Sequence, residues 1–228
     1  LGEALGGLKG PLMKVAQILS TIPDALPPEY REELAKLQAD APSMGWLFVK
    51  RRMMTELGND WQNKFKGFDK QSCSAASLGQ VHKAISVDGK SLACKLQYPD
   101  MQSAIEADLK QLKLAFNLYE RADKAISTKS IHKELSARLA EELDYKREAS
   151  NLKLYSAILK SEKNVFVPDV IDNLSTDRLL TMTWLEGNKL VEWLERKPDL
   201  KSRNNVAVNM FKAWYVPFYF YGVIHGDP

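Results

Sequence analysis

The sequence predicts an α+β fold in which a small antiparallel sheet interrupts a mostly helical chain. Apolar residues recur at spacings of three and four over residues 8–22, the period of an amphipathic helix, and residues 100–160 are again helical in character. Between these regions, two strand-like runs at 80–85 and 92–96 flank Asp88-Gly89, a hairpin signal. These observations place the sheet near residues 71–98, with helices before and after it.

The other elements follow in order along the chain. Pro23, Pro27 and Pro28 end the first helix, because proline breaks the helical pattern. Further helices are expected at 29–37, 46–57, 101–122, 130–161, 190–195 and 204–222. Short strands are expected at 65–70, 168–171 and 178–182, with a turn at 173–177. The last helix is rich in aromatic residues, and we interpret it as a buried core helix because its apolar run is too short to span a membrane.

Composition narrows the class of protein. The chain has 228 residues, 45% of them hydrophobic, and a net charge of +3, which does not favour nucleic acid as a partner. No stretch of about twenty apolar residues appears, and the sequence shows no signal peptide. Cys73 and Cys94 lack metal-type spacing, so we expect small core residues in a reducing compartment.

The sequence also contains the parts of a nucleotide pocket. Residues 74–82 form a turn of small residues, which would let backbone N–H groups approach phosphates. Lys95 follows on an apolar strand and would supply a fixed positive charge nearby. An edge lysine in solvent is the alternative for Lys95 alone. The upstream loop favours the nucleotide site, because kinase-like folds put the phosphate loop one hairpin before such a lysine.

Three further residues would complete such a site. Glu148 shares a helical stripe with apolar residues and is the candidate carboxylate partner of Lys95. Glu186 follows a predicted strand, where a hinge between lobes would offer backbone groups to adenine. Asp227, in His225-Gly226-Asp227, would accept or orient the proton of a nucleophile. Each carboxylate taken alone could instead be a surface residue, but the order of the features is that of a kinase.

The chain resembles the UbiB-type atypical kinase-like family of ubiquinone (coenzyme Q) biosynthesis. The segments that carry the resemblance are the Lys-x-Gly-Gln-like run at 9–17, the alanine-rich loop at 75–82, the strand lysine motif at 93–99, the helix signature at 142–151 and the start of a catalytic loop at 225–228. Ala16 stands where the first of these usually has glycine, a mild change in a helix. The resemblance implies a protein-kinase-like fold that binds and hydrolyses ATP with Mg²⁺ and has little or no kinase activity on proteins.

The resemblance also implies roles for individual residues. Lys95 would bind phosphates and Glu148 would pair with it, while Asp227 would be the aspartate of the catalytic loop. The residues that would cover the nucleotide are Ala75, Ala76 and Ser77. The residues that would meet at the pocket from the helical extension and its partner helix are Lys14, Gln17 and Glu142, with Glu142 paired to Lys14. Lys14 and Gln17 lie three apart on a helix, so they point the same way.

We therefore expect a helical extension at 1–62, a kinase-like N-lobe with inserted helices at 63–186, and the start of a C-lobe at 187–228. The sequence has no initiator Met and stops before the expected Mg²⁺ ligands, so we interpret it as a fragment that is itself inactive. Expected partners are ATP, quinone-precursor lipids and other quinone-biosynthesis proteins, with peripheral membrane contact. The expected location is cytoplasmic at a bacterial inner membrane, or the matrix face in mitochondria. A small-molecule phosphotransferase and a non-catalytic, nucleotide-gated lipid-binding or scaffold protein are the alternatives.

Overall fold

The computed structural model describes residues 44–76, 78–107, 109–110, 113 and 128–226. Its strands are β1 (Phe65–Phe68), β2 (Ser74–Ala76), β3 (Gly79–Ser86), β4 (Ser91–Gln97) and β5 (Leu179–Thr183). Its α-helices are α4 (Trp46–Leu57), α6 (Thr128–Glu142), α7 (Tyr145–Leu159), α8 (Leu190–Glu195) and α9 (Leu200–Tyr221), with short 3₁₀ turns η1 (Trp61–Lys64) and η2 (Asp172–Leu174). Residues 101–107 are also helical.

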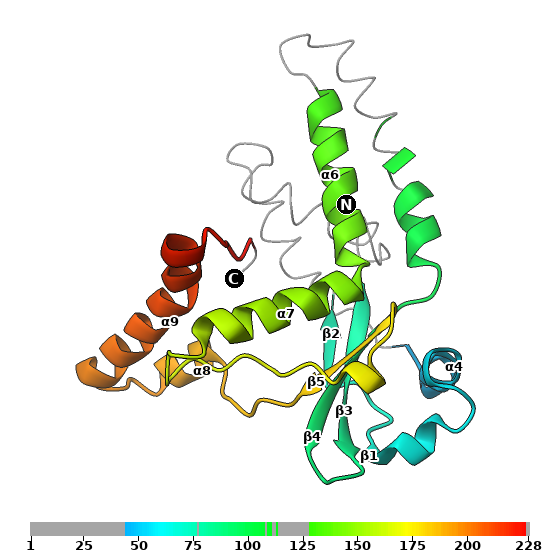
Figure 1. The fold of residues 1–228 in the computed structure, drawn as a ribbon, viewed down its shortest axis with the longest axis horizontal. Coiled ribbons are helices and arrows are strands. Elements are labelled where there is room, and N and C mark those ends of the chain that lie inside the picture. Colours follow the sequence, from blue (N-terminus) through cyan, green and yellow to red (C-terminus); the bar gives the residue numbers. More distant parts are fainter. Residues whose placement is uncertain (1–43, 77, 108, 111–112, 114–127, 227–228) are drawn as a thin grey trace.

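The sheet is antiparallel throughout, in the order β1-β3-β4-β5, with β2 paired to β3 at one end. The hairpin of β3 and β4 turns at residues 87–90, as Asp88-Gly89 predicts. In this register Val81 lies opposite Lys95, and Lys95 lies opposite Leu180. From the sheet, α7 runs toward α9, and α6 stands upright from the α7 end nearest the strands (Figure 1).

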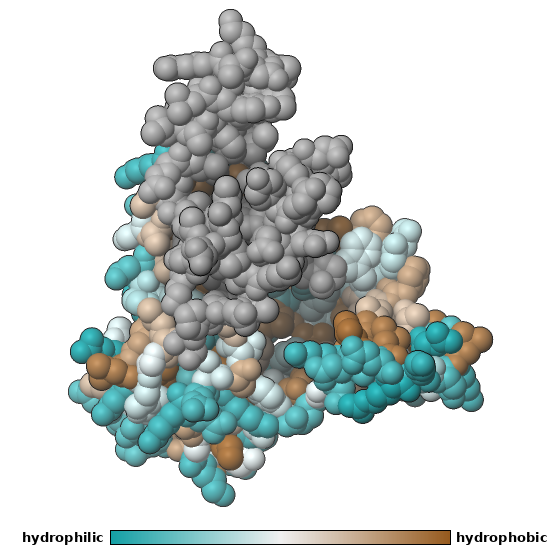
Figure 2. Space-filling view, turned by 180° about the vertical axis from the view of Figure 1, so that it is seen from behind, coloured by the Kyte–Doolittle hydropathy of each residue, from teal (hydrophilic) through white to brown (hydrophobic). Residues whose placement is uncertain are grey.

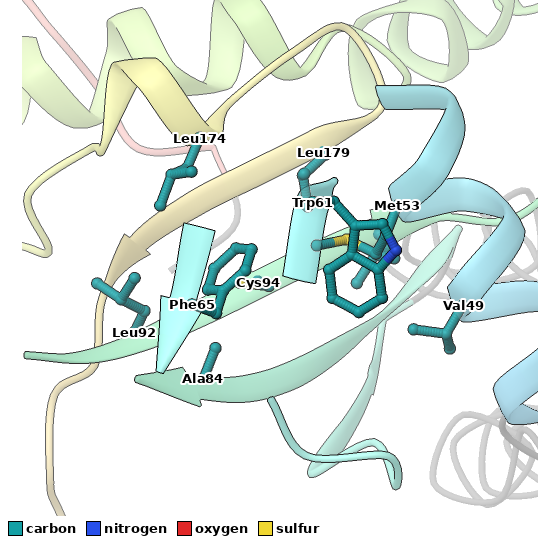
Figure 3. Packing of buried hydrophobic residues seen from close by; sticks show 10 residues of the cluster. Val49, Met53, Trp61, Phe65, Ala84, Leu92, Cys94, Leu174 and Leu179 are labelled. Carbon is teal, nitrogen blue, oxygen red and sulfur yellow. The ribbon is translucent and has the colours of Figure 1, made fainter. Parts of the chain in front are cut away.

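One face of the sheet carries the core. Because side chains alternate across a strand, Leu92, Cys94 and Leu96 point to the same face of β4. Val49 and Met53 of α4 pack on this face together with Trp61 (Figure 3). The helix α4 falls in the predicted extension but shares the sheet's core, and the division of the chain at residue 62 stays a prediction.

A buried polar chain crosses the same face. The side chain of Gln80 accepts a hydrogen bond from the backbone N–H of Met44 (2.7 Å) and donates to its carbonyl (3.2 Å). Gln80 also contacts Nε2 of His82 at 2.8 Å, and Nδ1 of His82 lies 2.8 Å from the carbonyl of Asp69. Since the amide of Gln80 donates to Nε2, Nδ1 carries the proton, and His82 is neutral. The chain that enters α4 is thereby fixed to β3.

The long helix predicted over 130–161 is wrong, because two helices form there. α6 ends at Glu142 and α7 begins at Tyr145. Between them Asp144 caps α7, its carboxylate accepting a hydrogen bond from the backbone N–H of Arg147 at 2.9 Å. Aspartate favours such caps over helix interiors, since its side chain competes for backbone N–H groups. The separate start of α7 puts Glu148 in a first helical turn.

Three smaller predictions are also wrong. Residues 74–76 form a strand rather than a loop, so the turn between β2 and β3 is tighter than predicted. The strand predicted at 168–171 reduces to an isolated bridge between Val170 and Met182. Cys73 is exposed, whereas Cys94 is buried as predicted.

The helix α9 was predicted to be buried, but Pro217 is its one buried residue in the part of the chain that the structure describes. Phe211, Tyr219 and Phe220 are exposed, and apolar surface lies over the α8–α9 end (Figure 2). Within the described residues α9 packs mainly on α7, which leaves its other sides open. No described helix is long and apolar enough to cross a membrane.

Candidate functional site

The strand lysine and the helix glutamate meet. Nζ of Lys95 lies 2.7 Å from Oε1 and 2.8 Å from Oε2 of Glu148, so one ammonium group binds both carboxylate oxygens. The pair is half-buried, with 21% of the Lys95 side chain and 36% of the Glu148 side chain exposed. Because an ammonium has three N–H groups, one remains available to a ligand.

Local structure places both partners. Lys95 lies on β4 between the buried Cys94 and Leu96, so its side chain emerges on the sheet face opposite the core. Glu148 lies in the first turn of α7, where the positive end of the helix dipole stabilises a carboxylate. The pair therefore ties α7 to the open face of the sheet.

Tyr145 lies under this pair. The Lys95 ammonium is 5.0 Å from the centroid of the Tyr145 ring, within the range of a cation–π contact. The tyrosine is 1% exposed, and burial, followed by the nearby carboxylates of Glu148 and Glu142, raises the pKa of its hydroxyl. The hydroxyl therefore stays neutral. The sequence analysis did not find Tyr145, although its position three residues before Glu148 puts both on one helix face.

The alanine-rich segment adjoins the pair as a hairpin. Ala75 and Ala76 lie on β2, where Ala76 pairs with Gly79 of β3. A Cβ added at Gly79 would lie 2.4 Å from the carbonyl oxygen of Leu96 and 2.9 Å from the hydroxyl of Tyr145. Glycine is therefore required for this close approach, a position that the sequence analysis did not single out. Ser77 lies outside the described residues.

The segment after β5 is also bound to the sheet. Lys83 of β3 donates to Oε1 of Glu186 at 2.8 Å, and its ammonium lies 4.6 Å from the ring centroid of Trp184. The hydrogen bond from Lys83 lowers the pKa of the Glu186 carboxyl. The Glu186 side chain is 77% exposed, so its carboxylate faces solvent and Lys83. Sequence analysis missed Lys83, whose partner is 103 residues away along the chain.

The start of the predicted catalytic loop lies against α7 and α9. The ring of His225 makes an edge contact with Tyr155 of α7, with centroids 5.8 Å apart, and its carbonyl accepts a hydrogen bond from Trp214. The helix that carries Glu148 thus also contacts His225. Asp227, Lys14 and Gln17 lie outside the described residues. Glu142 is half-buried at the end of α6, but its predicted contact with Lys14 is not described.

The arrangement suits a phosphorylated ligand. It offers one available ammonium N–H beside a tight backbone turn, the donor set that phosphate groups accept. In the described part of the chain no cluster of three or more His, Cys, Asp or Glu side chains could hold a metal ion. An antiparallel sheet with a lysine held by a helix glutamate defines a protein-kinase-like domain.

The comparison with protein families agrees. Residues 36–228 match the ABC1 atypical kinase-like domain, so the chain belongs to the ABC1 atypical kinase-like family. This confirms the resemblance that the sequence motifs carry.

Two relatives and one solved structure illustrate the relationship. The chain is 32% identical to the mitochondrial atypical kinase COQ8 of Saccharomyces cerevisiae, over 90% of the chain and 41% of that protein. It is 30% identical to the mitochondrial atypical kinase coq-8 of Caenorhabditis elegans, over 97% of the chain and 29% of that protein. The structure of Rv3197 from Mycobacterium tuberculosis, a complex with erythromycin, matches with a TM-score of 0.59 and 35% identity over 83% of the chain and 48% of Rv3197. The chain spans about two-fifths of the length of the curated relatives that it matches first.

Proposed function

We propose that the protein is an atypical kinase-like ATPase that binds ATP with Mg²⁺ on the Lys95 side of its sheet and supports ubiquinone biosynthesis. The two-oxygen ion pair between Lys95 and Glu148 carries this proposal. In protein kinases a strand lysine must be held by a helix glutamate before it can bind the phosphates of ATP. The pair is formed here at hydrogen-bond distance.

Each part of the site then has a role. Lys95 binds the phosphates through its remaining N–H, and Glu148 holds the ammonium in place. The hairpin of Ala75 and Ala76, continued by Ser77, covers the nucleotide, while the backbone near Glu186 offers hydrogen-bonding groups to adenine. Lys14 and Gln17 reach the pocket from the extension, with Glu142 as the partner of Lys14. Asp227 acts in the catalytic loop, and the Mg²⁺ ligands lie beyond Pro228.

The link to quinones rests on the family. The yeast and nematode relatives are mitochondrial atypical kinases named COQ8 and coq-8. We propose quinone-precursor lipids and other quinone-biosynthesis proteins as partners, at the matrix face of a mitochondrial membrane or the cytoplasmic face of a bacterial inner membrane. A small-molecule phosphotransferase remains the second candidate, because His225-Gly226-Asp227 also occurs in kinases of choline or aminoglycosides.

The test uses the full-length protein. Thermal unfolding is measured with and without Mg²⁺-ATP, and ATP hydrolysis is measured with and without quinone-precursor-like phenols and anionic liposomes. We expect stabilisation by the nucleotide and hydrolysis that phenols or liposomes alter. Absence of stabilisation by any nucleotide would refute ATP binding. Rapid phosphorylation of a soluble amine or alcohol would favour the phosphotransferase.

A further inference from the structure

Tyr145 touches two parts of the site at once. The face of its ring lies 5.0 Å from the ammonium of Lys95, and its hydroxyl lies beside Gly79, where an added Cβ would be only 2.9 Å away. It is 1% exposed and lies one helical turn before Glu148. Among the described residues its hydroxyl has no hydrogen-bond partner, so the ring rather than the hydroxyl makes the polar contact.

Lys95 needs more than one contact to stay in place. A lysine ammonium is a point charge on a flexible four-carbon stem, and it can rotate about any one hydrogen-bonded partner. Glu148 holds it from one side through two hydrogen bonds. An aromatic face attracts a cation electrostatically and is nearly incompressible, so it limits movement from a second side.

We propose that Tyr145 is a positioning residue that holds the Lys95 ammonium against Glu148 and directs its remaining N–H toward the ligand. This inference rests on the proposed nucleotide binding for its consequence, but not for its geometry. The same ring fills the space beneath the hairpin at Gly79, so it keeps a constant spacing between Lys95 and the alanine-rich segment. A residue in ordinary core packing would fill this space but would not act on the charge.

The first measurement reads the geometry without nucleotide. In full-length protein with ¹³C-labelled lysine ε-carbons, the ε-protons of Lys95 lie near the ring face and are shifted upfield by its ring current. The variant Lys95→Arg assigns the signal. Tyr145→Phe keeps the ring and should keep the shift, whereas Tyr145→Leu should lose it. An unshifted Lys95 signal in the unaltered protein would overturn the inference, whether or not any nucleotide binds.

The second measurement reads the consequence. Titration with Mg²⁺ and a non-hydrolysable ATP analogue should give affinities for Tyr145→Phe within about twofold of the unaltered protein, and about three- to tenfold weaker binding for Tyr145→Leu. Leu159→Ala, at the far end of α7, is the control for general destabilisation, because Leu159 is also buried. Its affinity per folded molecule should not change.

The outcomes separate the two proposals. If Tyr145→Leu binds the analogue as tightly as the unaltered protein, or if Leu159→Ala weakens binding equally, then Tyr145 has a packing role and the inference is wrong. If the unaltered protein binds no nucleotide, the proposed function fails, and the shift of the Lys95 signal still decides on the position of the ring.

Discussion

The two faces of the sheet are built from alternate residues of the same strands and serve opposite purposes. On β4, Leu92, Cys94 and Leu96 are buried against α4 and Trp61. Their neighbours Ala93 and Lys95 are half-buried on the other face, where Lys95 meets Glu148. The sheet thus separates stability from ligand contact within one strand. Substitutions on the core face should lower stability, and those on the site face should lower affinity.

The largest effect on stability is expected on the core face. Leu92→Ala removes a side chain that is 1% exposed and packs in the main cluster. We expect the free energy of unfolding to fall by about 2–5 kcal/mol, because the deletion loses apolar burial and leaves a cavity. Chemical denaturation of the full-length protein measures this loss. Nucleotide affinity per folded molecule should stay unchanged, and a loss of affinity larger than the loss of folded protein would break the comparison.

Gly79→Ala tests the place where the two faces meet the hairpin. The new Cβ would clash with the carbonyl oxygen of Leu96, which is backbone and cannot easily move. We expect about 1–3 kcal/mol of destabilisation, as in other overpacked sites, together with weaker nucleotide binding. Denaturation and titration check both effects.

Gly67→Ala is the matched control on β1, where an added Cβ meets only ordinary contacts with Ile85. Similar behaviour of the two variants would show that the space at Gly79 is not restrictive.

The core face should also respond to pH through His82. Burial lowers the pKa of His82 and outweighs the opposite effects of the Asp69 carbonyl and carboxylate. The unfolded chain therefore binds a proton more readily, so stability is present above about pH 6.5 and is lost as the pH falls toward the folded pKa. A single proton contributes a slope of at most about 1.4 kcal/mol per pH unit.

The measurement is denaturation between pH 7.5 and pH 5. Protonated Nε2 would face the amide donor of Gln80, so the contact to Met44 should loosen as well. The slope should be smaller in His82→Gln, which has no ionisable group. An equal slope in both proteins would assign the pH dependence to other residues.

The smallest effect is expected at the exposed end of the site face. Glu186→Gln removes the carboxylate that Lys83 binds, but surface ion pairs contribute little, so nucleotide affinity should change by no more than about twofold. The same titration at low and high salt checks this result. A tenfold loss would show that the Glu186 carboxylate, rather than the backbone beside it, contacts the ligand.

Much of the site could be predicted because its parts have local signals. Lys95 lies on an apolar strand after a hairpin, Glu148 lies on a helical stripe, and the ABC1 family match confirms the kinase-like interpretation. The ion pair that joins them was predicted from the order of features and is present.

Other features depend on tertiary structure. The break at Asp144 was missed because the apolar period continues across it, and only the cap shows that a new helix begins. Gln80 and His82 look like ordinary strand residues in sequence, since their partners Met44 and Asp69 lie on other segments. The contact of Tyr145 with Lys95 requires the register of α7 against β4, which sequence spacing does not fix.

The central claim is that the Lys95 face binds a nucleotide, and titration of the full-length protein with Mg²⁺ and a non-hydrolysable ATP analogue tests it most directly. Lys95→Ala should weaken binding by at least about tenfold, because it removes a charged hydrogen bond. Lys90→Ala, at the exposed tip of the same hairpin, is the control and should bind like the unaltered protein. Equal affinity of Lys95→Ala and the unaltered protein, or no binding by either, would contradict the account.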